Sequence, residues 1–156
     1  MAAVIGEPAP DFVLPGTTGR EDGRRDYTLE EYLGRPVVLV FYPGDNTPVC
    51  TRQLTAYTND IDDFAKVDAQ ILAISPQSVE SHEGFSCKQG GFAFPLLADE
   101  DKEVGRAYGT IGPLGFYRRS AFVIDTTGVL RYAHRALAGL TFRPTDELIA
   151  AVRADA

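Results

Sequence analysis

Residues 37–54 read VVLVFYPGDNTPVCTRQL, and this stretch decides how the rest of the chain is interpreted. Residues 37–42 are continuously apolar and rich in β-branched and aromatic side chains, which predicts a central strand covered on both faces. Residues 43–46, PGDN, are typical of a sharp turn. A helix is then expected to begin near Pro48. The stretch therefore predicts a strand, a turn and a helix whose first turn carries Cys50.

This position of Cys50 favours nucleophilic chemistry. If Thr47 is the N-cap, Pro48 occupies the first helical position, where proline is favoured because its missing N–H is not needed. Cys50 then lies among backbone N–H groups that have no partner within the helix, at the positive end of the helix dipole. Such surroundings favour the thiolate, which is the nucleophilic form of cysteine. The alternatives are that Cys50 is only a buried small side chain and that Thr47 is only a helix cap.

The other segments alternate strands and helices. Residues 8–23 hold a short apolar run that predicts an edge strand or a hairpin, and Thr28 with Glu31 predicts a capping box. Further strands are expected at residues 70–75, 92–97, 120–125 and 129–134, and helices at residues 48–64, 78–88, 99–109 and from Pro144 onward. This order predicts an α/β protein of thioredoxin-like fold, with a central mixed sheet flanked by helices and an N-terminal hairpin extension. We expect residues 1–156 to form a single domain.

Composition argues against several classes of function. The chain has 15 Lys and Arg against 22 Asp and Glu, a net charge of −7, and its basic pairs are Arg24 with Arg25 and Arg118 with Arg119. Binding to nucleic acid or to an anionic membrane is therefore not expected. The first residues lack the pattern of a signal peptide and no apolar run reaches membrane-spanning length, so a cytoplasmic location is expected. In that reducing setting the two cysteines are expected to be catalytic, redox-active or simply buried.

Several stretches resemble one known family. Pro43, Thr47 and Cys50 have the spacing PxxxTxxC, which resembles the active-site signature of the peroxiredoxins. The wider stretch FYPGDNTPVCT, residues 41–51, is similar to that of the peroxiredoxin Q group, also called bacterioferritin comigratory proteins. The resemblance extends over most of the chain, through PDFVLP at residues 10–15, FPLLADEDKEVGRAYG at 94–109 and RRSAFVIDTTGVL at 118–130.

The resemblance implies a peroxidase that acts on hydrogen peroxide and organic hydroperoxides without a cofactor. Cys50 resembles the peroxidatic cysteine, whose thiolate attacks a peroxide oxygen and becomes a sulfenic acid. Thr47 would offer its hydroxyl to the peroxide, and Arg119 would stabilise the thiolate and the charge on the leaving oxygen. Pro43 would shield the site from water, and Gln53 takes a place where the family often has an acidic or amide residue that orients the loop. The alternatives are a surface ion pair for Arg119 and a strand end for Pro43.

The second cysteine decides how the cycle would close. Many peroxiredoxin Q proteins carry a resolving cysteine five residues after the peroxidatic one, where this chain has Thr55. Another subset carries it on the following helix, which Cys87, 37 residues after Cys50, resembles. The resemblance thus implies a Cys50–Cys87 disulfide reduced by thioredoxin or a similar dithiol. The alternative is a one-Cys peroxidase, in which an external thiol reduces Cys50.

A disulfide between two helices requires motion. Two thiols bridge only when their Cα atoms approach within about 7 Å, so at least one helix must unwind locally. Glycines near both cysteines are expected to make such local unfolding easier: Gly44, Gly84, Gly90 and Gly91. A monomer or a weak homodimer is expected, with the aromatic loop at residues 110–117 leaving a dimer open.

Three other functions compete with this hypothesis. A thiol–disulfide oxidoreductase would need a second cysteine where Thr47 stands. A metal-binding module would recruit Cys50, Cys87, His82 and His134, yet their spacings match no zinc pattern, and isolated histidines are expected at the surface. A non-catalytic binding or chaperone-like module is the third alternative. No metal ligand set is predicted.

Overall fold

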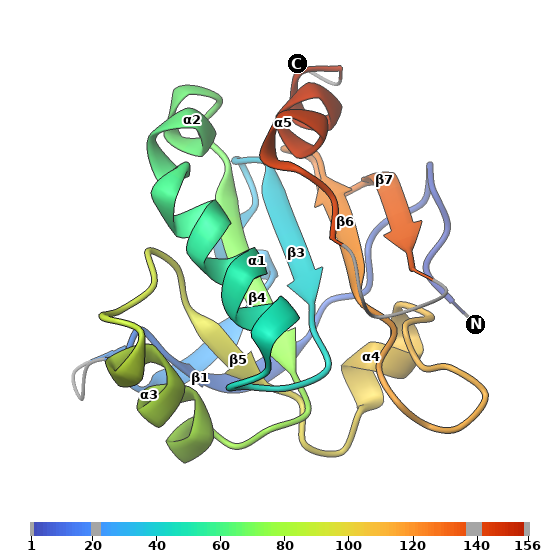
Figure 1. Cartoon of the computed structure of the whole chain (residues 1–156). Helices are drawn as coiled ribbons and strands as arrows, with labels where there is room; N and C mark the ends of the chain where they lie inside the picture. The colour runs from blue at the N-terminus through green and yellow to red at the C-terminus, as the bar shows by residue number, and fades with distance from the viewer. Residues whose placement is uncertain (1, 20–22, 137–141, 155–156) are drawn as a thin grey trace.

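The computed structural model describes residues 2–19, 23–136 and 142–154. Helices and strands alternate along the chain much as the sequence predicts, and Figure 1 shows their arrangement. In chain order the elements are β1 (Val13–Thr17), β2 (Arg25–Thr28), the 3₁₀ helix η2 (Glu30–Tyr32), β3 (Val37–Phe41), α1 (Pro48–Asn59), α2 (Ile61–Lys66), β4 (Gln70–Ser75), α3 (Val79–Lys88), β5 (Leu96–Ala98), α4 (Glu103–Ala107), β6 (Ser120–Ile124), β7 (Leu130–Arg135) and α5 (Thr145–Arg153).

The described strands form one mixed sheet in the order β2-β1-β5-β4-β3-β6-β7. Strand β4 is parallel to both β3 and β5, whereas β6 is antiparallel to β3 and to β7. Helices cover this sheet, and the predicted thioredoxin-like fold is confirmed. The predicted N-terminal hairpin is also confirmed as β1 with β2. The edge-strand alternative is wrong for β1, because β1 also pairs with β5 and leaves β2 at the edge.

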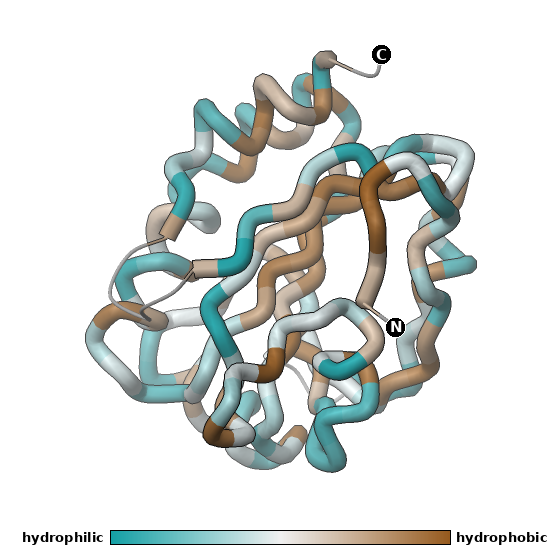
Figure 2. The backbone as a smooth tube through the Cα atoms, turned by 90° about the vertical axis from the view of Figure 1, so that its right-hand side faces the viewer, coloured by the Kyte–Doolittle hydropathy of each residue, from teal (hydrophilic) through white to brown (hydrophobic). Residues whose placement is uncertain are grey.

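Strand β3 lies at the centre of two hydrophobic cores. All its residues are fully buried, as a strand with apolar side chains on both faces requires. Val38 and Val40 contribute to the core under α1, α2 and α5, and Val37 and Leu39 to the core on the opposite face, which includes residues of α4. The tube in Figure 2 is brown along the inner strands and mostly teal or pale along the outer turns.

The predicted helix at residues 48–64 is divided in two. Helix α1 ends at Asn59 and α2 begins at Ile61, so the expectation of one continuous helix is wrong at Asp60. The Asp60 carboxylate accepts a hydrogen bond of 2.8 Å from the Thr145 hydroxyl at the start of α5. Asn and Asp are also poor formers of helix interiors. The apolar stripe nevertheless faces the core as expected, and Phe64 is fully buried.

Local capping signals behave as the sequence predicts. The Thr28 hydroxyl accepts from the Glu31 N–H at 3.2 Å, and the Glu31 carboxylate accepts from the Thr28 N–H at 2.8 Å, which is the reciprocal pair of a capping box. The Ser78 side chain accepts from the Ser81 N–H and caps α3. None of the helices within the described ranges has the length and apolarity needed to cross a membrane.

Candidate active site around Cys50

The first turn of α1 carries Cys50 as predicted. Thr47 is the N-cap residue with extended backbone, Pro48 is the first helical residue, and Cys50 is the third. The Cys50 side chain is fully buried against the core beneath α1. Burial keeps water away from the sulfur, so that charged groups beside it act through a lower effective dielectric than at the surface.

Arg119 reaches Cys50 through the pairing of two strands. Strand β6 begins at Ser120, which lies opposite Phe41 at the end of β3. Arg119 therefore lies next to the loop that leaves β3, and its guanidinium Nη2 donates to the Cys50 Sγ at 3.0 Å. Its side chain is buried, with the residue only 3% exposed, so the surface ion pair considered for it is wrong. A buried guanidinium on a sulfur is the arrangement that stabilises a thiolate.

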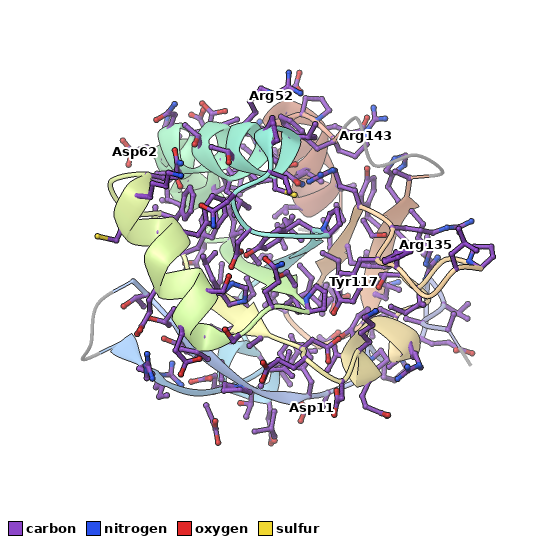
Figure 3. All side chains as sticks on the ribbon, turned by 60° about the horizontal axis from the view of Figure 1, so that its bottom comes forward. Asp11, Arg52, Asp62, Tyr117, Arg135 and Arg143 are labelled. Carbon is purple, nitrogen blue, oxygen red and sulfur yellow. The ribbon has the colours of Figure 1, made fainter. Side chains whose placement is uncertain are left out.

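Gln53 contacts the same guanidinium, and Tyr57 lies one turn further along α1. Gln53, one turn after Cys50, is buried, and its Oε1 accepts from the Arg119 Nη1 at 2.5 Å. This contact holds the guanidinium plane from a second side, so the contact shown for Gln53 is with Arg119 and not with the loop it was expected to orient. Burial raises the pKa of Tyr57 to about 12, so its hydroxyl stays protonated and donates to the Arg143 carbonyl at 2.5 Å. In Figure 3, Arg52 instead projects outward from α1, whereas Tyr117 lies in the interior.

Pro43 and Thr47 belong to the loop that precedes Cys50. Thr47 is exposed, and its hydroxyl donates to the Gly44 carbonyl at 3.0 Å instead of accepting from a helix N–H. Thr47 holds the predicted N-cap position, but its side chain does not cap the helix, because its hydroxyl turns back into the preceding loop. The alternative that Thr47 is only a helix cap is therefore wrong for its side chain. Pro43 is half-buried at the end of β3. The loop between them includes Asn46 with a positive φ of 63°, a conformation that asparagine tolerates better than most residues.

Comparison with known proteins bears on what this site does. The family model described as "AhpC/TSA family" matches residues 5–133 of the chain. The chain belongs to the AhpC/TSA family. Among its relatives, rat peroxiredoxin-2 is 38% identical over 136 residues, covering 83% of this chain and 68% of the rat protein. A chloroplastic peroxiredoxin Q of Oryza sativa subsp. japonica is 35% identical over 131 residues, covering 83% of this chain but 58% of the plant protein.

Solved structures agree with this assignment. The structure of Mycobacterium tuberculosis AhpC superimposes with a TM-score of 0.88 at 26% identity, covering 99% of this chain and 98% of that one. The expected likeness to peroxiredoxins, including a peroxiredoxin Q, is thereby confirmed. Membership of this family supports a thiol peroxidase among the alternatives drawn from the sequence.

The two cysteines lie on different helices. Cys50 is buried in α1, whereas Cys87 is exposed on α3, and both thiols are free. The surface around Cys87 is hollowed and lined by Gly19, Arg24, Glu83 and Gly84. The structure thus brings Arg119 and Gln53 to Cys50 but does not bring Cys87 there. Among the described residues, no three His, Cys, Asp or Glu side chains gather in a group able to hold a metal ion.

A buried polar cluster beside this site was missed by sequence reasoning. Its members are Tyr42, Asp45, Ser81 and His82, of which His82 is fully buried, so the expectation of a surface histidine is wrong for it. The Asp45 carboxylate accepts from the Tyr42 and Ser81 hydroxyls and from the His82 Nδ1, each at 2.7 Å. His82 shares the buried face of α3 with Val79, Phe85 and Ser86, and that helical spacing is the signal that could have indicated its burial.

Electrostatics in this cluster follow from burial and hydrogen bonding. Burial and then the neighbouring Asp45 carboxylate raise the pKa of Tyr42 well above its usual value, so its hydroxyl remains a donor. Burial opposes ionisation of Asp45, but hydrogen bonds from His82, Tyr42 and Ser81 outweigh it and lower the pKa of Asp45. Asp45 is therefore ionised at neutral pH and holds three donors around one carboxylate.

Proposed function

We propose that this chain reduces hydrogen peroxide and organic hydroperoxides with Cys50 as the peroxidatic cysteine. The Cys50 thiolate attacks one peroxide oxygen, an S–O bond forms and the O–O bond breaks. The thiolate sulfur is oxidised to a sulfenic acid, and the departing oxygen takes a proton and leaves as water or an alcohol. The observation that carries this proposal is the 3.0 Å contact between the Arg119 guanidinium and the buried Cys50 sulfur.

The positions of the residues around Cys50 indicate a role for each in the peroxide reaction. Arg119 stays protonated and directs donors at the sulfur, so it stabilises the thiolate and the negative charge that develops on the departing oxygen. Gln53 orients Arg119 through the other guanidinium nitrogen. Thr47, exposed at the start of the helix, offers its hydroxyl to the incoming peroxide. Pro43 shields the thiolate from water at the end of β3.

We assign Cys87 as the resolving cysteine. Its sulfur attacks the Cys50 sulfenic sulfur, an S–S bond forms and the sulfenic oxygen leaves as water. A dithiol of the thioredoxin type then reduces this disulfide and is itself oxidised. Cys87 is exposed and lies in the last turn of α3, where helices fray most readily, which supports a helix end that opens to deliver the thiol. A cytoplasmic location and a monomer or weak homodimer stay predictions.

The test is peroxide-dependent oxidation of thioredoxin by wild type, Cys50→Ser and Cys87→Ser. Wild type is expected to turn over, and Cys50→Ser to be inactive. Cys87→Ser should consume one equivalent of peroxide but lose turnover with thioredoxin. After that equivalent, non-reducing mass analysis of wild type should show an intramolecular disulfide. An active Cys50→Ser would refute the peroxidase; full turnover by Cys87→Ser would refute only the resolving role and favour the one-Cys alternative.

A further inference from the structure

The loop before Cys50 is tied to the helix that carries Cys87. Strands β3 and β4 are parallel, so the loops at their carboxyl ends leave the sheet at the same edge, and α1 and α3 begin there (Figure 1). Asp45 belongs to the first loop, and His82 and Ser81 belong to the first half of α3. The three side chains meet between the two elements.

The contacts are strong by their chemistry. The Asp45 carboxylate accepts from the His82 Nδ1 and the Ser81 hydroxyl, both at 2.7 Å. The Asp45 N–H donates to the side chain of Gln77, in the loop before α3. Asp45 therefore binds α3 through its carboxylate and the loop before α3 through its backbone N–H. Hydrogen bonds to a charged group are about twice as strong as neutral ones.

The imidazole of His82 is enclosed by acceptors. Its Nδ1 faces the Asp45 carboxylate, and its Nε2 lies 3.0 Å from the Leu97 carbonyl of β5. Separating the loop from α3 would leave the buried Asp45 carboxylate without its partners His82 and Ser81, which costs free energy, so these contacts oppose that separation.

We propose that Asp45, Ser81 and His82 form a tether that keeps the Cys50 loop and α3 closed together, and that its strength sets how fast Cys87 reaches an oxidised Cys50. This inference rests on the proposed function in taking Cys87 as the resolving cysteine. Disulfide formation requires the two Cα atoms to approach within about 7 Å, and neither the loop nor α3 moves toward that geometry while the tether holds. The three are positioning residues and touch no reacting atom.

The tether also decides between two fates of the sulfenic acid. Attack by the Cys87 thiol gives a disulfide and water. If the Cys50 sulfenic acid instead attacks a second molecule of hydrogen peroxide, it is oxidised to a sulfinic acid and water is released. A tight tether delays the first reaction and leaves time for the second. Weakening it should therefore raise the disulfide yield and lower the sulfinic acid yield at the same peroxide concentration.

Two tether variants and a distant control test this. Asp45→Asn keeps the shape of the side chain but removes the charge, and Ser81→Ala removes one hydrogen bond. Tyr108→Phe removes a partly buried hydrogen bond of 2.6 Å to the Pro10 carbonyl on the other face of the sheet. Reduced proteins receive hydrogen peroxide, are quenched with acid at intervals, and are analysed by mass for disulfide and sulfinic acid. Hydrogen exchange is measured separately on the reduced proteins.

Asp45→Asn should form the disulfide about tenfold faster than wild type, the change that corresponds to about 1.4 kcal/mol in the opening equilibrium. Ser81→Ala should also form the disulfide faster than wild type, by a smaller factor. Alanine is a better helix former than serine, so helix propensity alone would stabilise α3 and slow the reaction. Tyr108→Phe should match wild type. Unchanged rates in both tether variants, or an equal acceleration in Tyr108→Phe, would overturn the tether.

Hydrogen exchange separates this inference from the proposed function. In both tether variants, amides of residues 45–52 and of residues 79–88 should exchange faster together, with no matching change in Tyr108→Phe. Loosening of only one segment would contradict the tether, whatever the cysteines do. If wild type forms no Cys50–Cys87 disulfide, the resolving role of Cys87 fails, and coupled exchange still decides whether the tether exists.

Discussion

Replacing Arg119 tests the electrostatic core of the site. Arg119→Met removes the guanidinium while keeping an unbranched side chain of comparable length. At the observed separation of 3.0 Å and an effective dielectric constant of about 20, the gross attraction between guanidinium and thiolate is about 5 to 6 kcal/mol. Desolvation of both groups offsets part of it, and hydrogen bonds to charged groups contribute about 1.5 to 3 kcal/mol net. The peroxide reaction should therefore slow roughly 10- to 150-fold.

The assay is a single turnover with limiting peroxide. Fully reduced protein reacts with less than one equivalent of hydrogen peroxide, and the remaining peroxide is followed in time to give a second-order rate constant. Arg118→Met is the matched control, since Arg118 is the same residue type one position earlier and only partly buried. Arg119→Lys should fall between, because lysine retains the charge but not the fork that spans Cys50 and Gln53.

Folding must be measured beside activity, because Arg119 is buried. Thermal unfolding of each variant should show a cooperative transition, so that a slow reaction is not mistaken for an unfolded protein. The reasoning fails if folded Arg119→Met reacts with peroxide within twofold of wild type. It also fails if Arg118→Met slows the reaction as much as Arg119→Met does, since the effect would then be one of general positive charge.

Three further predictions concern Thr47, Gln53 and the turn between β6 and β7 that holds Asp125. Thr47→Val should slow the peroxide reaction roughly 2- to 10-fold with little change in unfolding free energy, and Thr47→Ser should restore it. Gln53→Leu removes the acceptor of the hydrogen bond from the Arg119 Nη1 and should lower stability to urea by about 1 to 3 kcal/mol as well as activity; a stable, fully active variant contradicts this. Burial opposes ionisation of Asp125, but hydrogen bonds from Thr127 and Arg131 outweigh it and lower its pKa well below the usual value. The contribution of ionised Asp125 to the free energy of unfolding is present at neutral pH and is lost progressively as the pH falls below about 4. Urea titrations should therefore show that Asp125→Asn is less stable than wild type by about 1 to 2 kcal/mol at pH 7 and that this difference shrinks toward pH 3. A difference that stays constant with pH contradicts the prediction.

Much of the fold was predictable because its signals are local. The apolar run of β3, the turn after it and the proline at the start of α1 act over a few residues, and the structure has each where the sequence predicts it. The capping box of Thr28 with Glu31 is local in the same sense. Asp60 was not predictable in this way, because the helix break there depends partly on a hydroxyl from Thr145, far along the chain.

The sequence by itself determined the thiol, its helix and the loop before it, since Pro43, Thr47 and Cys50 belong to one continuous stretch. Arg119 was proposed only through resemblance; what places its guanidinium on a sulfur 69 residues away is the pairing of β6 with β3. Only the tertiary structure decided that His82 is buried against Asp45. It also decided that Cys87 is exposed on α3 whereas Cys50 is buried on α1. Helix propensity and caps act between neighbours in sequence, whereas these contacts depend on which strands pair and in what register.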